Sequence, residues 1–322
     1  MRTTVKRAAA VCALAALPSL AAWPGPAGDL KVVVTSKPAH ALVAGVMDGI
    51  AVPMVLIAGP ASPHSYAMKP SDAQAVNGAS VFFRISEGLE PFTGKLLRSL
   101  PKSVRVVSLG EAPGIQHLAK RTGATFDRLG GRGHDLGHGH GHAAAKAGAE
   151  RDPHVWLDPQ NAKAMVTEIA RVLAEVAPVH ANMLRSNALA LNQRLDALDA
   201  RLAAELKPLA GKPFIVMHDA VQYFEQRYGL AATGSISISP DLQPSAKRLT
   251  ELRKKVQALG AVCVFSEPNF ESKVVNAVIE GTSARTGVLD PEGTALAPSA
   301  LAYESLMTGL ARGLAACLGG TS

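Results

Sequence analysis

Histidine is concentrated in one short segment of this chain, and imidazole is a common ligand for transition metals. Four of the ten histidines stand within nine residues, separated mainly by glycine: His134, His138, His140 and His142. Because glycine offers no side chain for packing, we expect the surrounding segment, residues 132–150, to form a flexible loop that scavenges metal ions. A solvated linker that binds nothing is the alternative.

A further histidine, His154, follows twelve residues later in a different setting. It belongs to an apolar segment that runs from Pro153 to Pro159 and contains Trp156 and Leu157. The prolines restrict the backbone, and the two large apolar side chains can anchor the segment in a core. We therefore expect His154 to lie in a rigid site to which the loop delivers metal, or for which it senses metal. An ordinary core histidine is the alternative.

Polar residues also follow the strands predicted in the second half of the chain. Each strand ends on residues that can bind a metal: 214–217 on His218, 262–265 on Ser266 and Glu267, and 287–289 on Asp290. Side chains at the carboxyl ends of parallel strands meet in one cleft, and imidazole and carboxylate are zinc ligands. Capping of the following helices would explain Asp219 and Ser266, but it would not explain a histidine.

The elements that must position these residues alternate between strand and helix. The first half contains β-branched runs at 29–36, 52–57, 79–85 and 104–108, with helical patterns at 40–50 and from Ser71 between them. Such alternation predicts an α/β fold with a parallel sheet. His64 follows the second strand in a turn-rich loop, where it can reach the ligand cleft. A solvated loop histidine is the alternative.

Residues 161–206 carry a long helical pattern with one interruption, at Pro178. The part from 182 to 206 would form a helix of nearly 40 Å, estimated at about 1.5 Å for each residue. Its leucines do not hold a heptad, so we expect a stiff connector rather than a coiled coil. A chain of 322 residues exceeds what one hydrophobic core usually holds, and this predicts two domains.

The first 22 residues have the layout of a secretory signal. Basic residues precede an apolar run at 8–17 that is too short to span a bilayer, and small residues follow it. We expect cleavage near Ala21 or Ala22 and export of a soluble mature protein. Cys12 lacks the lead-in of a lipoprotein signal, so no lipid anchor is expected.

Composition excludes a nucleic-acid surface and suggests a disulfide. Removing residues 1–22 lowers the net charge from +7 to 30 − 26 = +4, and aromatic residues make up only 4% of the chain. Such scattered charge does not form a nucleic-acid interface. Cys263 and Cys317 remain in a compartment that permits disulfides, and we expect a structural bridge rather than a catalytic thiol.

Four linked motifs carry a family resemblance. They are Ala61-Ser62-Pro63-His64-Ser65-Tyr66 with Pro70-Ser71-Asp72, His154-Val155-Trp156-Leu157-Asp158-Pro159, His218-Asp219-Ala220 with Tyr223-Phe224, and Leu289-Asp290-Pro291. In this order and spacing the chain resembles the zinc-specific periplasmic solute-binding proteins of ATP-binding-cassette importers. The resemblance covers essentially the whole mature chain, including the histidine-rich insert and the cysteine pair.

The resemblance implies two α/β lobes, each with a mainly parallel sheet flanked by helices, joined by one long connecting helix. After the signal at 1–22, the expected parts are an N-terminal lobe (23–178), the connecting helix (179–208) and a C-terminal lobe (209–322). A metal ion would be held between the lobes. The implied partner is an inner-membrane permease, and a monomer is expected.

The ligands that the resemblance implies are His64, His154 and His218. Some zinc relatives have a glutamate directly before the first ligand histidine, where this chain has Pro63. We therefore expect Asp290 to be the fourth ligand, with water or Glu267 as alternatives. If Glu267 does not bind the metal, it would contact one of the ligand residues instead. Manganese relatives have a glutamate in place of His218, so three histidines favour zinc.

Two other functions share this ligand set. In a zinc hydrolase the ion would activate water with Glu267 as general base, but the sequence lacks an HExxH-type motif. A surface adhesin of the same fold is a third class, and a receptor for manganese or another divalent metal is a variant of the first. Three histidines remain as surface or supporting residues: His40, His117 and His180.

Overall fold

The fold is described from a computed structural model of the chain. It covers residues 30–121, 126, 150–237, 245–259, 263–268, 270 and 272–319. The expected signal segment with its cleavage site, and the four histidines of the 132–150 loop, lie outside these residues.

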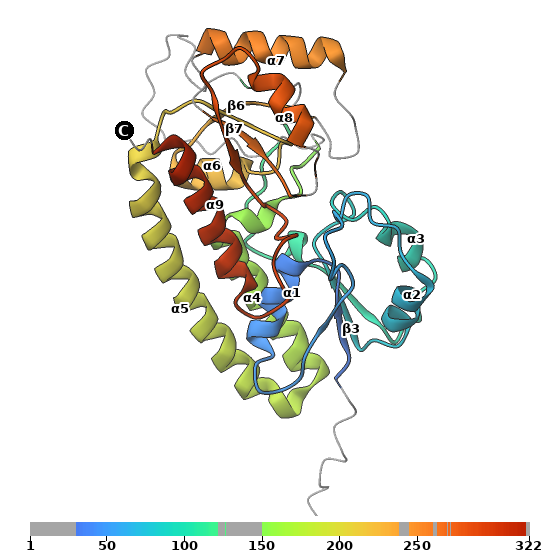
Figure 1. Cartoon of the computed structure of the whole chain (residues 1–322). Helices are drawn as coiled ribbons and strands as arrows, with labels where there is room; N and C mark the ends of the chain where they lie inside the picture. Colours follow the sequence, from blue (N-terminus) through green and yellow to red (C-terminus); the bar gives the residue numbers. More distant parts are fainter. Residues whose placement is uncertain are drawn as a thin grey trace, which may run out of the picture.

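The N-terminal lobe is built on a parallel sheet in the order β2–β1–β3–β4 (Figure 1). Its strands are β1 (Val32–Val34), β2 (Met54–Val55), β3 (Val81–Arg84) and β4 (Arg105–Ser108). The β-branched residues of β1 are buried on both faces, as expected for a strand inside a parallel sheet. The four strands predicted here are confirmed, with shorter ends.

Three helices accompany this sheet: α1 (Lys37–Val46), α2 (Pro70–Asn77) and α3 (Thr93–Leu97). The helix predicted at 40–50 starts earlier, because Pro38 suits the first turn of a helix and lacks the N–H that an interior position needs. It also ends earlier, at Val46, and the following Gly49 has a positive φ of 72° that other residues rarely adopt.

The C-terminal lobe repeats the design with a parallel sheet in the order β6–β5–β7–β8. Its elements are β5 (Phe214–Val216), α6 (Gln222–Tyr228), β6 (Ala232–Ser235), α7 (Ala246–Leu259), β7 (Cys263–Ser266), α8 (Ser272–Ile279) and β8 (Arg285–Val288). Strand β6 was not predicted from the sequence, and β8 was predicted at 287–289. The lobe therefore has one more strand than expected.

Three long helices lie between and along the two lobes: α4 (Pro159–Val176), α5 (Ala181–Leu206) and α9 (Ala302–Leu318) (Figure 1). Short 3-10 turns surround them: η1 (Leu109–Glu111), η2 (Val155–Leu157), η3 (Pro178–His180) and η4 (Lys207–Leu209). The predicted break at Pro178 and the predicted long linking helix are confirmed. None of the helices in the described ranges is long and apolar enough to cross a membrane.

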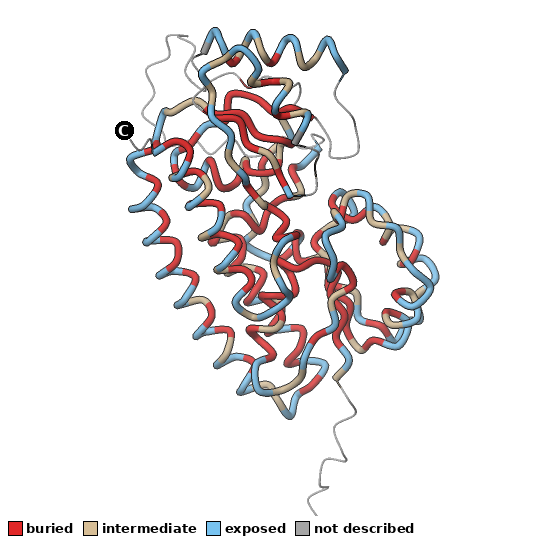
Figure 2. Tube along the Cα trace, in the orientation of Figure 1, coloured by how far each residue is buried: buried red, intermediate tan, exposed pale blue. Residues whose placement is uncertain are grey.

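One hydrophobic core runs through both lobes. A single cluster of buried residues includes Val34 of β1, Leu42 of α1, Leu195 of α5, Phe265 of β7 and Leu310 of α9. Figure 2 shows this buried band along the inner faces of the long helices. Helices α1, α4, α5 and α9 therefore form a shared layer onto which both sheets pack.

The predicted disulfide is present between Cys263 and Cys317, which are separated by 54 positions in the chain. Cys263 begins β7 and Cys317 lies near the end of α9, so the bond ties the last helix to the C-terminal sheet. Both residues are buried.

Candidate metal centre

Three histidines from separate segments meet between the lobes. His64 lies in the loop between β2 and α2, His154 directly precedes η2, and His218 follows β5. One ligand nitrogen from each lies within 4.8 Å of the others. The Nε2 atoms of His64 and His154 are 3.1 Å apart. These three residues were expected to form one site, and the structure brings them together.

The ring of His154 is held from behind by Asp152. Asp152 Oδ1 accepts hydrogen bonds from the backbone N–H of His154, at 3.0 Å, and from its Nδ1, at 2.7 Å. This contact leaves Nε2 facing the other histidines. Burial raises the pKa of Asp152 to about 7, and burial also holds the pKa of His154 well below its ordinary value. His154 is therefore neutral at physiological pH, as a metal ligand must be.

His218 is held in the same way by Glu267, whose Oε1 lies 2.6 Å from Nδ1. Burial lowers the pKa of His218, but the Glu267 carboxylate outweighs burial and raises it to about 9. The Nε2 atom is buried and has no hydrogen-bond partner in the described part of the chain. A metal ion between the three rings would satisfy this nitrogen and displace its proton.

His64 faces a different carboxylate, that of Glu292. The distance from His64 Nε2 to Glu292 Oε1 is 3.7 Å, and the Ser62 hydroxyl donates a 2.9 Å hydrogen bond to the same oxygen. Burial raises the pKa of Glu292 to about 7. Burial and the neighbouring histidines lower the pKa of His64 to about 2, so this ring is also neutral.

The carboxylates are arranged differently from the prediction. Asp290 Oδ1 accepts from the backbone N–H and hydroxyl of Thr294, and Oδ2 accepts from the backbone N–H of Ala295. Asp290 does not join the group formed by the three histidines. Its role as fourth ligand stays a prediction, and Glu292 is a second candidate that the sequence analysis missed.

Asp152 was also missed, although its position two residues before His154 was a usable signal. Asp219, which could have been explained as a helix cap, does not cap α6. Its carboxylate forms an ion pair with Arg121, at 2.9 Å from Nε, and α6 begins after Val221 instead.

The remaining histidines of the described ranges lie outside the cluster. His40 is buried in α1 and its Nε2 is 3.1 Å from the carbonyl oxygen of Pro53. The Nε2 atom of His117 lies 4.0 Å from Glu111 Oε2 and 3.4 Å from Arg151 Nη1. His180 ends the 3-10 turn before α5.

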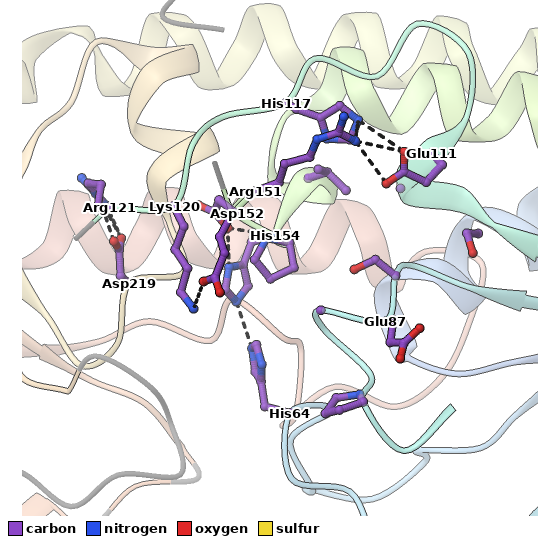
Figure 3. Close-up of a pocket in the computed structure, with 18 of the residues that line it drawn as sticks. His64, Glu87, Glu111, His117, Lys120, Arg121, Arg151, Asp152, His154 and Asp219 are labelled. Carbon is purple, nitrogen blue, oxygen red and sulfur yellow. Dashed lines mark hydrogen bonds and ion pairs between the residues drawn. The ribbon is translucent and has the colours of Figure 1, made fainter. Parts of the chain in front are cut away.

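A cavity of about 720 Å³ leads to the three histidines, and residues of both lobes line it. Figure 3 shows His64 and His154 pointing toward each other, with Lys120 beside His154 and with His117 and Glu111 farther along. Two of the three imidazoles are neutral, and a metal ion can displace the proton of the third, His218. Three such rings at the end of an accessible cavity match the donor set of a zinc site with three protein nitrogens. The arrangement can therefore bind a divalent transition metal.

Comparisons with known proteins agree with this geometry. The family model for the periplasmic zinc-uptake complex component A matches residues 32–317. A high-affinity zinc uptake system protein ZnuA from Brucella abortus is 44% identical over 309 residues, with 89% of this chain and 91% of the relative covered.

Two solved structures share the fold. A crystal structure of ZnuA has a TM-score of 0.71 at 24% identity and covers 90% of this chain and 100% of that chain. An Mn-bound periplasmic metal binding protein from candidatus liberibacter asiaticus has a TM-score of 0.70 at 18% identity and covers 89% and 99%. Since the family model spans nearly all of the described chain, the chain belongs to the family of periplasmic zinc-uptake complex components.

Proposed function

We propose that this protein is a periplasmic receptor that captures Zn²⁺ and delivers it to the permease of an ATP-binding-cassette importer in the inner membrane. The observation that carries the proposal is the convergence of three buried imidazoles, two of which have their Nδ1 atoms held by carboxylates. This support behind a ligand histidine fixes the ring and raises its basicity, and it is typical of zinc sites.

The proposed ligands are His64, His154 and His218, with a carboxylate as the fourth. Asp290 is the predicted fourth ligand, and it would have to leave its contacts with Thr294 to reach the ion. Glu292 needs a smaller movement, because its Oε1 is already 3.7 Å from His64. Both residues lie on the turn after β8, so the same segment supplies the oxygen in either case.

Zinc is the proposed cargo, because three imidazoles suit a borderline-soft cation better than manganese, which prefers oxygen ligands. The role is capture and release, without catalysis. The histidine-rich segment at 132–150 would provide additional, weaker zinc sites through His134, His138, His140 and His142. Residues 1–22 would direct export and be removed near Ala21 or Ala22.

Replacing one ligand tests the site directly. We expect His154→Ala to weaken zinc binding by more than the roughly 10–100-fold that loss of a supporting residue costs, because it removes a metal–nitrogen bond. Competition with a chromophoric chelator measures the affinity. Zinc should also raise the melting temperature of the wild type far more than that of the variant, since binding to the folded state stabilises it by RT ln(1 + [L]/Kd).

His180→Ala is the matched control, because this histidine is remote from the cluster in sequence and contacts. It should keep wild-type affinity. Tight binding of one zinc equivalent by His154→Ala would refute the ligand assignment. Zinc-dependent hydrolysis of ester or peptide substrates by the wild type would refute the receptor role in favour of an enzyme.

A further inference from the structure

The cavity beside the three histidines contains a rigidly held arginine, Arg84, that the proposed zinc site does not use. Arg84 is the last residue of β3, at the carboxyl end of the N-terminal sheet. Its Nε donates to the hydroxyl of Ser108 at 3.0 Å, and its Nη1 donates to the hydroxyl of Thr93 at 2.7 Å. Two neutral hydroxyls thus fix the guanidinium without neutralising it.

The charge of Arg84 has no carboxylate partner among the described residues. The other lysine and arginine side chains of the cavity wall do have partners: Lys120 with Glu150, Arg121 with Asp219, and Arg151 with Glu111. Glu87 lines the same cavity, but it is exposed and forms no ion pair with Arg84 in the described ranges.

The buried acid nearest in the chain, Glu90, feels this charge, since the Arg84 guanidinium favours its ionised form, but the hydrogen bonds that it accepts come from other groups. Both of its oxygens already accept hydrogen bonds, from the hydroxyl of Thr35 and from the backbone N–H groups of Ile85 and Ser86. Burial raises the pKa of Glu90 to about 7. The guanidinium of Arg84 is therefore a fixed cation at the cavity wall, and its Nη2 group and second Nη1 hydrogen remain to donate to a carboxylate.

The cavity is far larger than a metal ion requires. Its volume of about 720 Å³ lies in the range of small-molecule sites, roughly 300–1,000 Å³. The three histidines line it, whereas Asp290 and Glu292 do not. An external oxygen ligand that enters through this cavity can therefore take the fourth coordination position in place of Asp290 or Glu292.

We propose that the receptor binds zinc together with a small polycarboxylate anion. One carboxylate of the anion would bind the zinc from the cavity side, and a second would pair with Arg84. The cargo class would then be a zinc–polycarboxylate complex in addition to the free ion. This inference rests on the proposed function, since the three histidines must hold the zinc.

Citrate is a suitable probe. Native mass spectrometry of the zinc-loaded full-length mature protein should show a species with one zinc and one citrate, and calorimetric titration of citrate into that protein should give one saturable site. We expect Arg84→Gln to weaken citrate binding about 10–100-fold, the value of a hydrogen bond to a charged group. Zinc affinity in chelator-free buffer should stay at the wild-type value.

Two further variants make the test specific. Ser108→Ala removes one hydroxyl that holds Arg84 and should give a smaller loss of citrate binding. Arg105→Gln is the matched control, because Arg105 is half exposed, pairs with Glu175 and does not line the cavity. It should bind citrate as the wild type does.

The proposal is overturned if citrate only strips zinc from the wild type without forming a ternary species, or if Arg84→Gln binds citrate as tightly as the wild type. Either result leaves the receptor function intact when zinc alone still binds tightly. Absence of tight zinc binding in chelator-free buffer would instead overturn the proposed function.

Discussion

At the scale of single residues, the structure assigns different tasks to the two nitrogens of an imidazole ring. In His154 and His218 the Nδ1 atom is engaged by a carboxylate, at 2.7 and 2.6 Å. This contact places the proton of the neutral ring on Nδ1 and leaves the lone pair of Nε2 for a metal. Asp152 and Glu267 therefore orient the rings of His154 and His218, the proposed ligands, and influence their charge.

Removing this support should weaken zinc binding without removing a ligand. We expect Asp152→Asn and Glu267→Gln each to lower zinc affinity about 10–100-fold. Chelator competition measures the change. Glu150→Gln is the matched control, since Glu150 lines the same cavity but is exposed and contacts Lys120. Wild-type affinity in both Asp152→Asn and Glu267→Gln would show that the carboxylates play no part in binding.

Glu90 should make the stability of the protein depend on pH. The folded state keeps this carboxyl protonated up to a pKa of about 7, whereas the unfolded chain loses the proton near 4.5. Between these values the folded state binds more protons, so the free energy of unfolding falls as pH rises from about 4.5 to 7, by on the order of 3 kcal/mol.

The Glu90→Gln variant should lack this fall, because an amide cannot ionise and can still accept from the backbone while donating to Thr35. Urea unfolding at several pH values measures it. Glu87→Gln, at an exposed position in the same loop, should retain the wild-type dependence. An unchanged pH profile in Glu90→Gln would exclude Glu90 as its source.

The histidines of the site could be predicted from the sequence because their signals are local. His218 directly follows a strand, and His154 stands inside an anchored apolar segment. Asp152 stands only two residues before His154, and this local signal was overlooked. The role of Glu292 could not be read in this way, since it depends on which loops of the two lobes come together. Asp290 shows the same limit: two backbone N–H groups and a hydroxyl of its own turn engage its oxygens.

At the scale of elements, α5 shows how one helix face is committed to the core. Leu195 is fully buried, whereas Leu189, on the opposite side, is 63% exposed. We expect Leu195→Ala to lower the free energy of unfolding by about 2–5 kcal/mol through the cavity it leaves. Leu189→Ala should change it by about 0.5 kcal/mol or less. Denaturant unfolding compares the two, and equal losses would contradict the packing described for α5.

Helices and most strands were predictable because their apolar periodicity is strong, as in β1 and α5. Strand β6 was not, because its sequence Ala232-Thr233-Gly234-Ser235 is short and poor in apolar side chains. Its position is fixed by pairing with β5 and by Thr233, whose hydroxyl donates to the carbonyl of Phe214. Such contacts between distant segments leave no periodic signal.

At the scale of the whole molecule, one face of each sheet belongs to a shared hydrophobic cluster, while the other face packs in a smaller cluster of its own lobe. We therefore expect the lobes to unfold together, in a single transition whose calorimetric and van 't Hoff enthalpies agree. Differential scanning calorimetry of the metal-free protein measures both. Two resolved transitions would show that the lobes are independent despite the shared helix layer.

The shared core also limits how zinc can enter and leave. Rotating the lobes apart as rigid bodies would expose the packed faces of α1, α4, α5 and α9, at roughly 25 cal/mol for each Å² of apolar surface. The loop that carries His64 is mostly exposed or half-buried, whereas the turn that carries Glu292 is buried from Pro291 to Thr294. Local opening of the loosely packed His64 loop costs less than global separation. We therefore expect entry and release of the ion to depend on local opening of the His64 loop rather than on a swing of whole domains. In kinetic terms, the rates of zinc uptake and release would then be set by this loop, while the two lobes keep a fixed relative position.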